Sequence, residues 1–327
     1  MIPKGKFVSE IQDGDRVKAV FLLADRRLLT ARNGKPYGRV VVSDKTGDIT
    51  GLIWDDAPEQ ISAVSPGDVV GVRATAESYD RKVQLRIEKI TRLADKEVDL
   101  SALIPTSPRD LPALEALLDE AIDGMKDPFL KALVNRVFAR PGVRESFVKA
   151  PAAKGIHHNY IGGLLEHTVT VIRAADALLP VFAHLELNRD MIIAGAILHD
   201  LGKIYEYTYG KVIDMTPVGR LLGHIYLSAH MVDEEACAIE GFPEELRLQI
   251  LHMILGHHGQ LEFGSPKLPM TREAVFLHMM DDLDAKLTGI TSLIQATPED
   301  EPFTAFSSVY NRFLYTRTYR DDPGEEK

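Results

Sequence analysis

The sequence has almost no cysteine and no long apolar run, and these two absences narrow the class of protein. The single cysteine, Cys237, excludes an internal disulfide framework and a cysteine-rich zinc site. No stretch reaches the roughly 18 uninterrupted apolar residues of a membrane span. The start, MIPKGKFVSEIQDGD, lacks the apolar core of a secretion signal. We therefore expect a cytoplasmic protein without a membrane partner.

Internal repeats are also missing, and the charged tail DDPGEEK at residues 321–327 is the only low-complexity segment. The 327 residues suffice for about two domains. The net charge of −10 is unevenly distributed, because residues 1–92 carry 16 Lys and Arg against 13 Asp and Glu, and the remainder carries 22 against 35. The acidic total therefore does not exclude a basic binding groove on the smaller half.

The first part of the chain has the pattern of short β-strands. The segments DRVKAVFLLA, YGRVVVSD, GDITGLIW, GDVVGVRATAE and KVQLRIEKI are rich in Val and Ile and partly alternate between apolar and polar residues. Turn sequences such as NGKPYG, DKTGD and SPGD separate them. Five short strands within residues 1–92 predict an all-β OB-fold barrel.

From Pro105 onward the apolar residues repeat at three and four positions, which predicts helices. The helical segments include ALEALLDEAIDGM, FLKALVNRVFA, LLEHTVTVIRAADALL, DMIIAGAILHDLGKIYEY and the run from Thr271 to Ile294. Leu93 to Pro112 is polar and contains proline. We therefore predict a linker at residues 93–112 and an all-α bundle at residues 113–320.

Histidines and carboxylates in the helical half form the candidate site. Several lie on or beside predicted apolar helix faces, and mixed imidazole and carboxylate ligands suit Mn, Fe, Co, Ni or Zn better than Ca. A single histidine on an apolar face is more often a hydrogen-bonded core residue, so only the set indicates a metal site. The candidates are His167, His199, Asp200, His224, His257, His258 and Asp281.

The adjacent pair His199-Asp200 in ILHDLGK is the most informative part of this set. Neighbouring side chains on a helix project about 100° apart, so both reach one ion only if it lies between them. Gly202 predicts a loosened helix that would open this space. Since an unpaired aspartate is costly to bury among apolar residues, a bound cation is the favoured explanation.

The ordered set of His, His-Asp, His, His-His and Asp resembles the HD superfamily of metal-dependent phosphohydrolases. This resemblance implies a bundle of helices around two divalent metal ions, with Asp200 bridging them. It further implies that the core ligands are His167, His199, Asp200 and Asp281, and that His224 and His257 complete a second metal site.

Two positions in this set stay open. One of His257 and His258 would bind metal while the other orients it or contacts substrate, and we place His258 in the catalytic group. Asp281, Asp282 and Asp284 compete for the last ligand position. The motif favours Asp281, with Asp284 as a residue that supports a ligand or caps a helix.

Phosphoryl oxygens outside a metal shell need cationic or amide donors. Lys203 lies one helical turn after His199 and so on the same helix face. In the HD superfamily a lysine at this place often contacts phosphate, which makes Lys203 a catalytic candidate beside Asp200. Arg220, one turn before His224, and Lys267 in GSPKLP are further candidates for phosphate contact.

Two more polar positions near the set have simpler interpretations. Glu166 is best explained as a partner that orients His167 or a neighbour. His157 and His158, in the loop GIHHNYIGG, have two interpretations, residues that line the mouth of the site or residues of a solvated loop, and we expect the second.

The barrel offers a candidate surface for nucleic acid. OB-folds bind single strands in a groove that combines positive charge with aromatic stacking surfaces. A charged hairpin face can also be merely solvated, and a tryptophan can belong to the core. The candidate contacts are Tyr37, Arg39, Lys45, Trp54, Arg81 and Lys82, with Tyr79 and Arg86 close in sequence.

The pairing of the two domains resembles the YhaM-type 3′–5′ exoribonucleases, which join an N-terminal OB-fold to a C-terminal HD domain. The likeness spans nearly the whole chain and includes GGLLEHT, LLGHI, ILGHHGQLEFGSPKLPMTREA and DDLDAKL. It implies a manganese- or cobalt-dependent enzyme that trims single-stranded RNA to mononucleotides from the 3′ end. Single-stranded DNA is a second candidate substrate, and homo-oligomerisation is left open.

Two other functions fit parts of this pattern. A hydrolase of a small phosphate ester, such as a nucleotide or cyclic dinucleotide, would use the barrel for assembly or regulation. A nucleic-acid-binding module whose HD half has lost catalysis is the other, but the full set of ligands argues against it.

Overall fold

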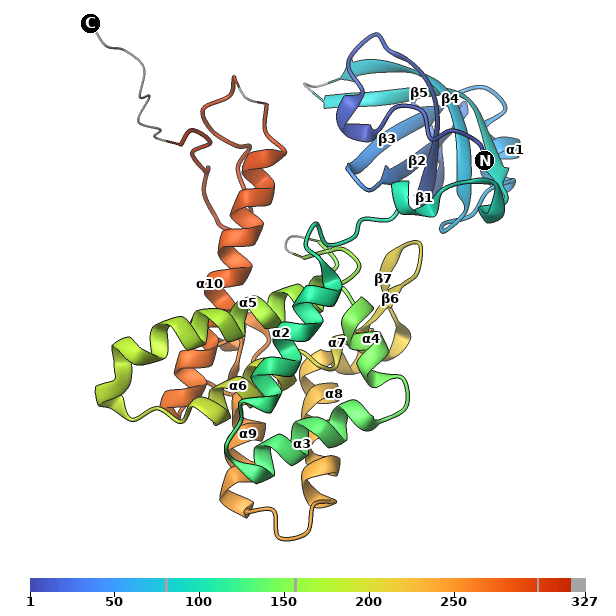
Figure 1. The fold of residues 1–327 in the computed structure, drawn as a ribbon. Coiled ribbons are helices and arrows are strands. Elements are labelled where there is room, and N and C mark those ends of the chain that lie inside the picture. The colour runs from blue at the N-terminus through green and yellow to red at the C-terminus, as the bar shows by residue number, and fades with distance from the viewer. Residues whose placement is uncertain (80–81, 156–157, 299, 319–327) are drawn as a thin grey trace, which may run out of the picture.

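The computed structural model describes residues 1–79, 82–155, 158–298 and 300–318. A β-barrel forms the N-terminal domain and a bundle of helices forms the larger C-terminal domain, with a connecting segment between them (Figure 1). Arg81, His157 and the charged tail lie outside the described residues.

Five strands close into the barrel in the order β1-β2-β3-β5-β4. β3 and β5 pair in parallel, and the other neighbours pair antiparallel. The inward side chains are mainly Val, Ile, Leu and Ala, since alternate residues of a strand point to opposite faces. The predicted barrel is confirmed, with one addition to the all-β description, the short helix α1. The elements are β1 (Arg16–Thr30), β2 (Pro36–Asp44), β3 (Gly47–Ile53), α1 (Ala57–Ser62), β4 (Val69–Tyr79) and β5 (Lys82–Leu93).

The second half is mostly helical, as predicted, but it is not all-α. A two-stranded hairpin of β6 and β7 follows α7, because the chain turns back at Gly210. The elements are α2 (Leu111–Asp123), α3 (Pro128–Ala139), α4 (Val143–Lys149), α5 (Gly163–Leu178), α6 (Arg189–Leu198), α7 (Lys203–Glu206), β6 (Tyr207–Tyr209), β7 (Ile213–Met215), α8 (Pro217–Cys237), α9 (Glu244–Gly256) and α10 (Arg272–Gln295).

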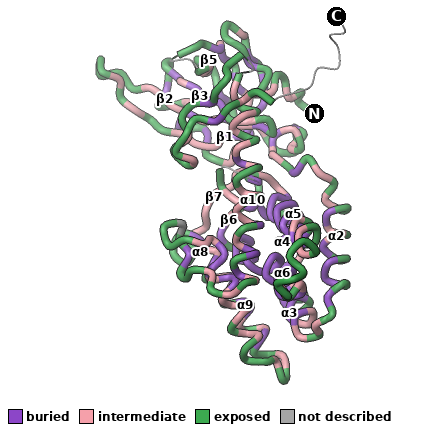
Figure 2. Tube along the Cα trace, turned by 90° about the vertical axis from the view of Figure 1, so that its left-hand side faces the viewer, coloured by how far each residue is buried: buried purple, intermediate pink, exposed green. Residues whose placement is uncertain are grey.

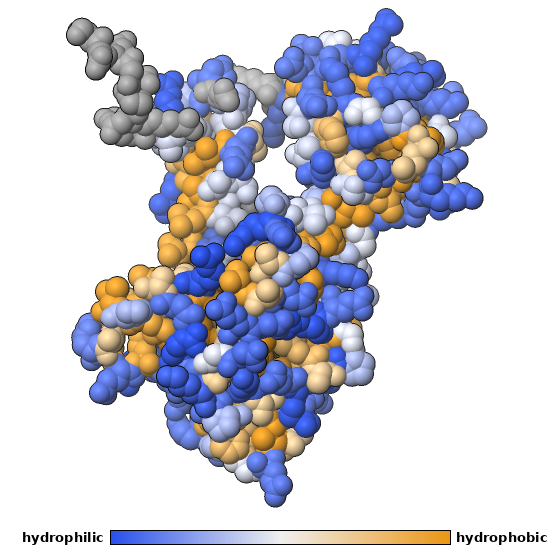
Figure 3. Space-filling view, viewed as in Figure 1, coloured by the Kyte–Doolittle hydropathy of each residue, from blue (hydrophilic) through white to orange (hydrophobic). Residues whose placement is uncertain are grey.

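The helical core surrounds α6, whose sequence MIIAGAIL is buried throughout. Buried residues are concentrated in α5 and α6 and inside the barrel (Figure 2). The first half of α10 packs against α5 and α6, and its second half projects from the bundle with apolar residues on its surface (Figures 1 and 3). α5, α6 and α10 therefore meet where the predicted ligands lie.

Among the described residues, one helical stretch, Gly163–Leu185, is long and apolar enough to cross a membrane by length and composition alone. This is weak evidence, because core helices of soluble proteins pass the same test. The first turns of this stretch belong to α5 and are buried in the helical core.

The connecting segment is attached to the barrel by a small apolar cluster of its own. Val98 and Leu103 pack against Val20, Leu22 and Val69 of β1 and β4. One outward face of the barrel is therefore partly covered where the chain leaves for the helices.

Candidate metal centre

His199 and Asp200 lie in a turn between two helices. α6 ends at Leu198, His199 caps it, and α7 starts after the turn. Gly202 allows this turn to pack closely on α8, because a Cβ at Gly202 would collide with the carbonyl oxygen of His224. The structure thus places a helix break at Gly202, and both side chains of the pair point toward the same region.

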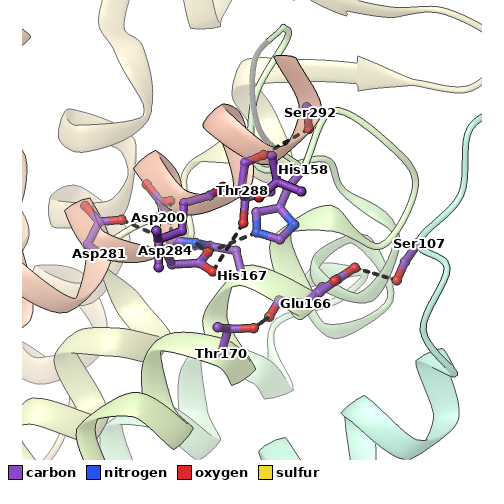
Figure 4. A network of polar contacts seen from close by, with 12 residues as sticks. Ser107, His158, Glu166, His167, Thr170, Asp200, Asp281, Asp284, Thr288 and Ser292 are labelled. Atoms are coloured by element: carbon purple, nitrogen blue, oxygen red, sulfur yellow. Dashed lines mark hydrogen bonds and ion pairs between the residues drawn. The ribbon is translucent and has the colours of Figure 1, made fainter. Parts of the chain in front are cut away.

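Four side chains converge on a first point. His167 Nε2 lies 3.1 Å from Asp281 Oδ1 and 3.4 Å from His199 Nε2. Asp200 Oδ2 lies 3.3 Å from His199 Nε2 and 3.7 Å from His167 Nε2. Figure 4 shows Asp200 and Asp281 pointing toward His167 from different segments. Two imidazole nitrogens and two carboxylate oxygens therefore face one another across a space that is only a few ångströms wide.

The other oxygen of Asp200 faces a second group of imidazoles. Asp200 Oδ1 lies 3.4 Å from His224 Nε2 and 3.6 Å from His257 Nε2. His258 belongs to the same group, since one ligand atom from each of His224, His257 and His258 lies within 4.8 Å of the others. Gly223 breaks α8 with a φ of +72° and so sets the direction of His224. The two oxygens of Asp200 thus face two separate imidazole groups.

Four imidazoles in the two groups are held through Nδ1, and Nε2 of each faces a carboxylate of the centre. Such outer hydrogen bonds fix the tautomer and orientation of metal-binding histidines. The pairs are His199 with Ala196 O at 2.9 Å, His257 with Ile254 O at 2.7 Å, His224 with Glu206 Oε2 at 3.0 Å and His167 with Asp284 Oδ2 at 2.7 Å.

A divalent cation fits these residues. Asp200 Oδ1, His224 Nε2 and His257 Nε2 are buried and have no hydrogen-bond partner among the described residues. Buried polar atoms are normally satisfied, so three such atoms around one point require an explanation. A bound transition-metal ion would satisfy all three, and imidazole with carboxylate is a donor set that such ions prefer.

The electrostatics of the centre also favour added positive charge. Burial lowers the pKa of His167 and His199, but the neighbouring carboxylates outweigh burial and raise these pKa values to about 9 and about 10. Burial raises the pKa of Asp200, yet nearby positive charges hold it well below its usual range. Burial keeps the pKa values of His224 and His257 below the ordinary value, which leaves neutral imidazoles suited to metal binding.

A pocket of about 290 Å³ opens onto the centre. Lys203 lines it and is buried, with Nζ 2.5 Å from Asp200 Oδ2. His258 and Asp282 also line the pocket, and the carboxylate of Asp282 pairs with Lys286 at 2.7 Å. Lys203 and His258 are thus placed beside the centre, whereas Asp282 is engaged at the surface.

The side chain of Glu166 contacts Ser107 and Tyr160 rather than His167, which corrects the expectation that it orients His167. Glu166 Oε2 accepts hydrogen bonds from Ser107 Oγ at 2.6 Å and Tyr160 OH at 2.9 Å. Figure 4 shows Glu166 directed to Ser107, while Asp284 lies against His167. Residues 166 and 167 are neighbours on a helix, so their side chains point in different directions.

His158 is buried rather than solvated, which corrects a second expectation. Its Nε2 lies 2.9 Å from Asp284 Oδ2 and its Nδ1 lies 2.8 Å from Tyr160 OH. Through Tyr160 and Glu166 these contacts form a continuous network from Ser107, in the connecting segment, to His167 (Figure 4). Loop residues have no periodic pattern, so this arrangement could not be predicted from the sequence alone.

The structure does not bring Arg220 or Lys267 into the pocket. Arg220 is exposed and pairs with Asp214 at 3.3 Å. The helical spacing to His224 does not apply, because α8 is broken at Gly223 between them. Lys267 is exposed in the loop before α10 and is not among the described residues that line the pocket.

On the barrel, Tyr37 and Trp54 form one aromatic platform. Their rings stack with centroids 4.9 Å apart and an interplanar angle of 21°, and Trp54 is 44% exposed. Arg39 is next to this platform on β2. Trp54 is thus available at the surface, with the ring of Tyr37 stacked against it.

Two further predicted basic contacts of the barrel, Lys45 and Lys82, are not next to the platform. Lys45 follows the far end of β2 and places its ammonium 5.2 Å from the ring centroid of Phe7. Lys82 is exposed at the start of β5.

Comparison with known proteins identifies the family. The 3′–5′ exoribonuclease YhaM of Geobacillus sp. (strain WCH70) is 35% identical over 314 residues, which cover 95% of this chain and 94% of that protein. The chain belongs to the YhaM family. A model described as an OB-fold nucleic acid binding domain matches residues 16–93, and the HD domain model matches residues 164–286. Both groups of candidate ligands in this YhaM family member lie within the HD match.

Solved structures resemble the YhaM family member in parts only. The second OB-fold domain of replication protein A from Methanococcus maripaludis matches 29% of this chain and 98% of its own, at 15% identity and a TM-score of 0.23. The HD domain of the L. monocytogenes phosphodiesterase PgpH matches 50% of this chain and 77% of its own, at 17% identity and a TM-score of 0.27. Scores this low carry no information on function.

Proposed function

We propose that the protein is a metal-dependent 3′–5′ exoribonuclease that shortens single-stranded RNA to mononucleotides in the cytoplasm. Its relative YhaM, which matches 95% of this chain, carries the name of that activity. The observation that supports the proposal best is the position of Asp200, whose two oxygens face two separate groups of imidazole nitrogens. One carboxylate shared in this way is what a two-metal hydrolytic site requires.

We propose that the centre holds two cations, with manganese as the physiological metal. When bound, such a pair supplies an activated water for attack at phosphorus and positive charge for the phosphoryl oxygens. The first cation would be held by His167, His199, Asp200 and Asp281, and the second by Asp200, His224 and His257. His258 lies at the edge of the second group, where it would complete that group or contact the substrate.

Lys203 is proposed to hold a phosphoryl oxygen. Its ammonium lies 2.5 Å from Asp200 Oδ2 and lines the pocket. Cations bound to Asp200 would take over the neutralisation of this carboxylate, which leaves the lysine charge for the substrate. A buried ammonium acts strongly on phosphate because water screens it little.

The barrel is proposed to hold the single strand through the platform of Tyr37 and Trp54. Bases of any sequence stack on exposed aromatic rings, so this contact suits an enzyme that degrades a strand without regard to sequence. Arg39 would add a phosphate contact beside the platform.

The proposal is tested with a long single-stranded RNA labelled at its 5′ end. The pure protein is first treated with a chelator and then supplied with Mn²⁺, Co²⁺ or Mg²⁺ in separate reactions. We expect a ladder that shortens from the 3′ end, and fastest shortening with Mn²⁺. Internal fragments, or turnover of small nucleotides alone, would contradict an exonuclease. An equal or greater rate with Mg²⁺ would contradict the proposed metal.

A further inference from the structure

A second face of the barrel carries three cationic side chains in one row. Lys18 of β1 is paired with Arg73 of β4, and Arg73 is paired with Lys89 of β5. Directly paired residues on neighbouring antiparallel strands point to the same side of a sheet, so these three side chains form a line across three strands. All three are exposed.

The stability of the sheet does not explain this row. Like charges directly opposite one another on neighbouring strands repel and destabilise a sheet. Arg73 has a nearby carboxylate in Glu88 at 3.4 Å, but both side chains are more than half exposed. Ion pairs of this exposure contribute little. A line of positive charge kept at the surface in this way is typical of a surface that binds anions.

The row borders a groove of about 520 Å³. The next row of the sheet pairs Val20 with Gly71 and Gly71 with Thr91, and all three residues line the groove. Because Gly71 lacks a side chain, the middle strand is hollowed between its two neighbours. The N-terminal residues Ile2 and Gly5 also line the groove. The site therefore combines a partly apolar floor with a cationic edge.

The groove lies apart from the aromatic platform, and Arg86, whose guanidinium is 3.7 Å from Glu77 Oε1, lies between them. It is formed by β1, β4 and β5, whereas Tyr37 lies on β2 and Trp54 follows β3. Arg86 of β5 is paired with Leu52 of β3 on one side and with Thr75 of β4 on the other. Arg86 therefore lies between the two surfaces and points outward.

We propose that this groove is a second binding surface for the phosphodiester backbone of single-stranded nucleic acid. One strand would then contact the barrel both at the platform and across β1, β4 and β5. The cationic row would contact the phosphates, and the floor around Gly71 would accept a sugar or base. This inference rests on the proposed function, because it takes the substrate to be a single strand.

The first test removes the charge of the row. The variant Lys18→Gln, Arg73→Gln, Lys89→Gln is compared with a control that loses the same charge on the helical half, Lys126→Gln, Arg136→Gln, Arg173→Gln. Affinity for a long oligonucleotide is measured by fluorescence anisotropy at several salt concentrations. Each lost phosphate contact on a single strand lowers the salt slope by about 0.7, so we expect a decrease of about 2 for the row variant. A slope equal to that of the control would overturn the proposal.

The thermal midpoint of the same variants separates binding from folding. Removal of opposed like charges should leave the row variant as stable as the wild type or more stable. Hydrolysis of a small chromogenic phosphodiester should also stay unchanged. If the row stabilised the fold, the row variant would instead have a lower thermal midpoint than the wild type.

The second test fills the groove without any change in charge. At Gly71 a Cβ would meet Leu93 at 3.4 Å, which is ordinary van der Waals contact, so the strand should accept Gly71→Val. We expect weaker binding of long oligonucleotides and an unchanged thermal midpoint. Wild-type affinity in this variant would place the strand elsewhere.

Failure of the groove and failure of the proposed function give different results. If the wild type shortens RNA and only Tyr37→Ala weakens binding, the groove is wrong and the function stands. If the wild type binds the oligonucleotide without shortening it, and the row variant loses salt slope, the function is wrong and the groove stands. If the wild type binds no oligonucleotide, both are wrong.

Discussion

The metal centre and the barrel surfaces place their charged groups in opposite ways. At the centre, Asp200 and His199 are buried, and four of the imidazoles are each fixed by a further hydrogen bond. On the barrel, Lys18 and Lys89 are exposed and are placed by strand pairing. Buried charges require compensation, whereas exposed ones remain hydrated. Substitutions at the centre should therefore have large effects, and substitutions on the barrel should have graded ones.

The largest loss of activity is expected for Asp200→Ala. A mild loss would contradict the expected difference between the buried centre and the exposed barrel surfaces. Loss of the shared carboxylate removes a ligand from both proposed cations, and metal catalysis is worth several kcal/mol. We expect RNA hydrolysis to fall at least about a thousandfold. Single-turnover rates measure this effect, with oligonucleotide affinity as the control that should stay near wild type. Substantial residual cleavage would contradict a bridging role.

A smaller loss of metal affinity and activity is expected for Asp284→Asn, because Asp284 orients the proposed metal ligand His167. Asp284 accepts from His167 Nδ1 at 2.7 Å, and loss of such partners typically costs 10- to 100-fold in metal affinity or activity. Metal titration followed by calorimetry measures the change directly. Asp282→Asn is the matched control, because its carboxylate pairs with Lys286 at the surface. Equal effects of the two variants would contradict the assignment of Asp284.

On the barrel, Tyr37→Ala should weaken oligonucleotide binding without an effect on a small phosphodiester. Stacking of a base on an aromatic side chain is worth about 1–3 kcal/mol. Since Trp54 remains, we expect the lower end of this range, roughly fivefold in affinity. Anisotropy titrations and kinetics with the chromogenic substrate provide the two measurements. Unaltered affinity would remove Tyr37 from the binding surface.

The smallest effect is a pH dependence of the metal-induced stabilisation. Without metal, the carboxylates raise the pKa of His167 to about 9, above the value of about 6.5 for an unfolded histidine. The bound proton therefore stabilises the fold fully below about pH 6.5, and this stabilisation is lost as pH rises through about 9. With metal bound, His167 is already deprotonated, so the loss does not occur. The difference in Tm between metal-loaded and metal-free protein should therefore grow by a few degrees between these pH values. A difference that shrinks over this range would contradict the prediction.

The metal centre is the part that sequence reasoning approached most closely. Its candidate ligands occur in a fixed order within apolar helical segments, and a buried aspartate beside a histidine needs a partner. The break after His199 was also signalled, by Gly202. The supporting residues were harder to recognise. Glu206 holds His224 from the end of α7, and His158 reaches Asp284 from a loop, so neither follows from helical spacing.

The barrel surfaces required the strand register. Lys18, Arg73 and Lys89 are far apart in sequence and form a row only when β1, β4 and β5 pair. In contrast, Lys45 is close to Tyr37 in sequence, but it follows the opposite end of the same strand. Closeness along the chain is therefore a poor guide to shared surfaces in a sheet, because each residue advances the strand by about 3.3 Å.

The network that begins at Ser107 has a consequence for how the two halves can be studied. Ser107 belongs to the segment that joins barrel and helices, and its hydroxyl contacts Glu166, from which side chains lead through Tyr160 and His158 to Asp284. Any change that detaches this segment from Glu166 also weakens the network that holds Asp284 against the imidazole of His167. Truncation of the barrel would thus alter cation affinity as well as strand capture, and an isolated catalytic domain should regain activity on a small phosphodiester, but not on RNA, when more metal is supplied.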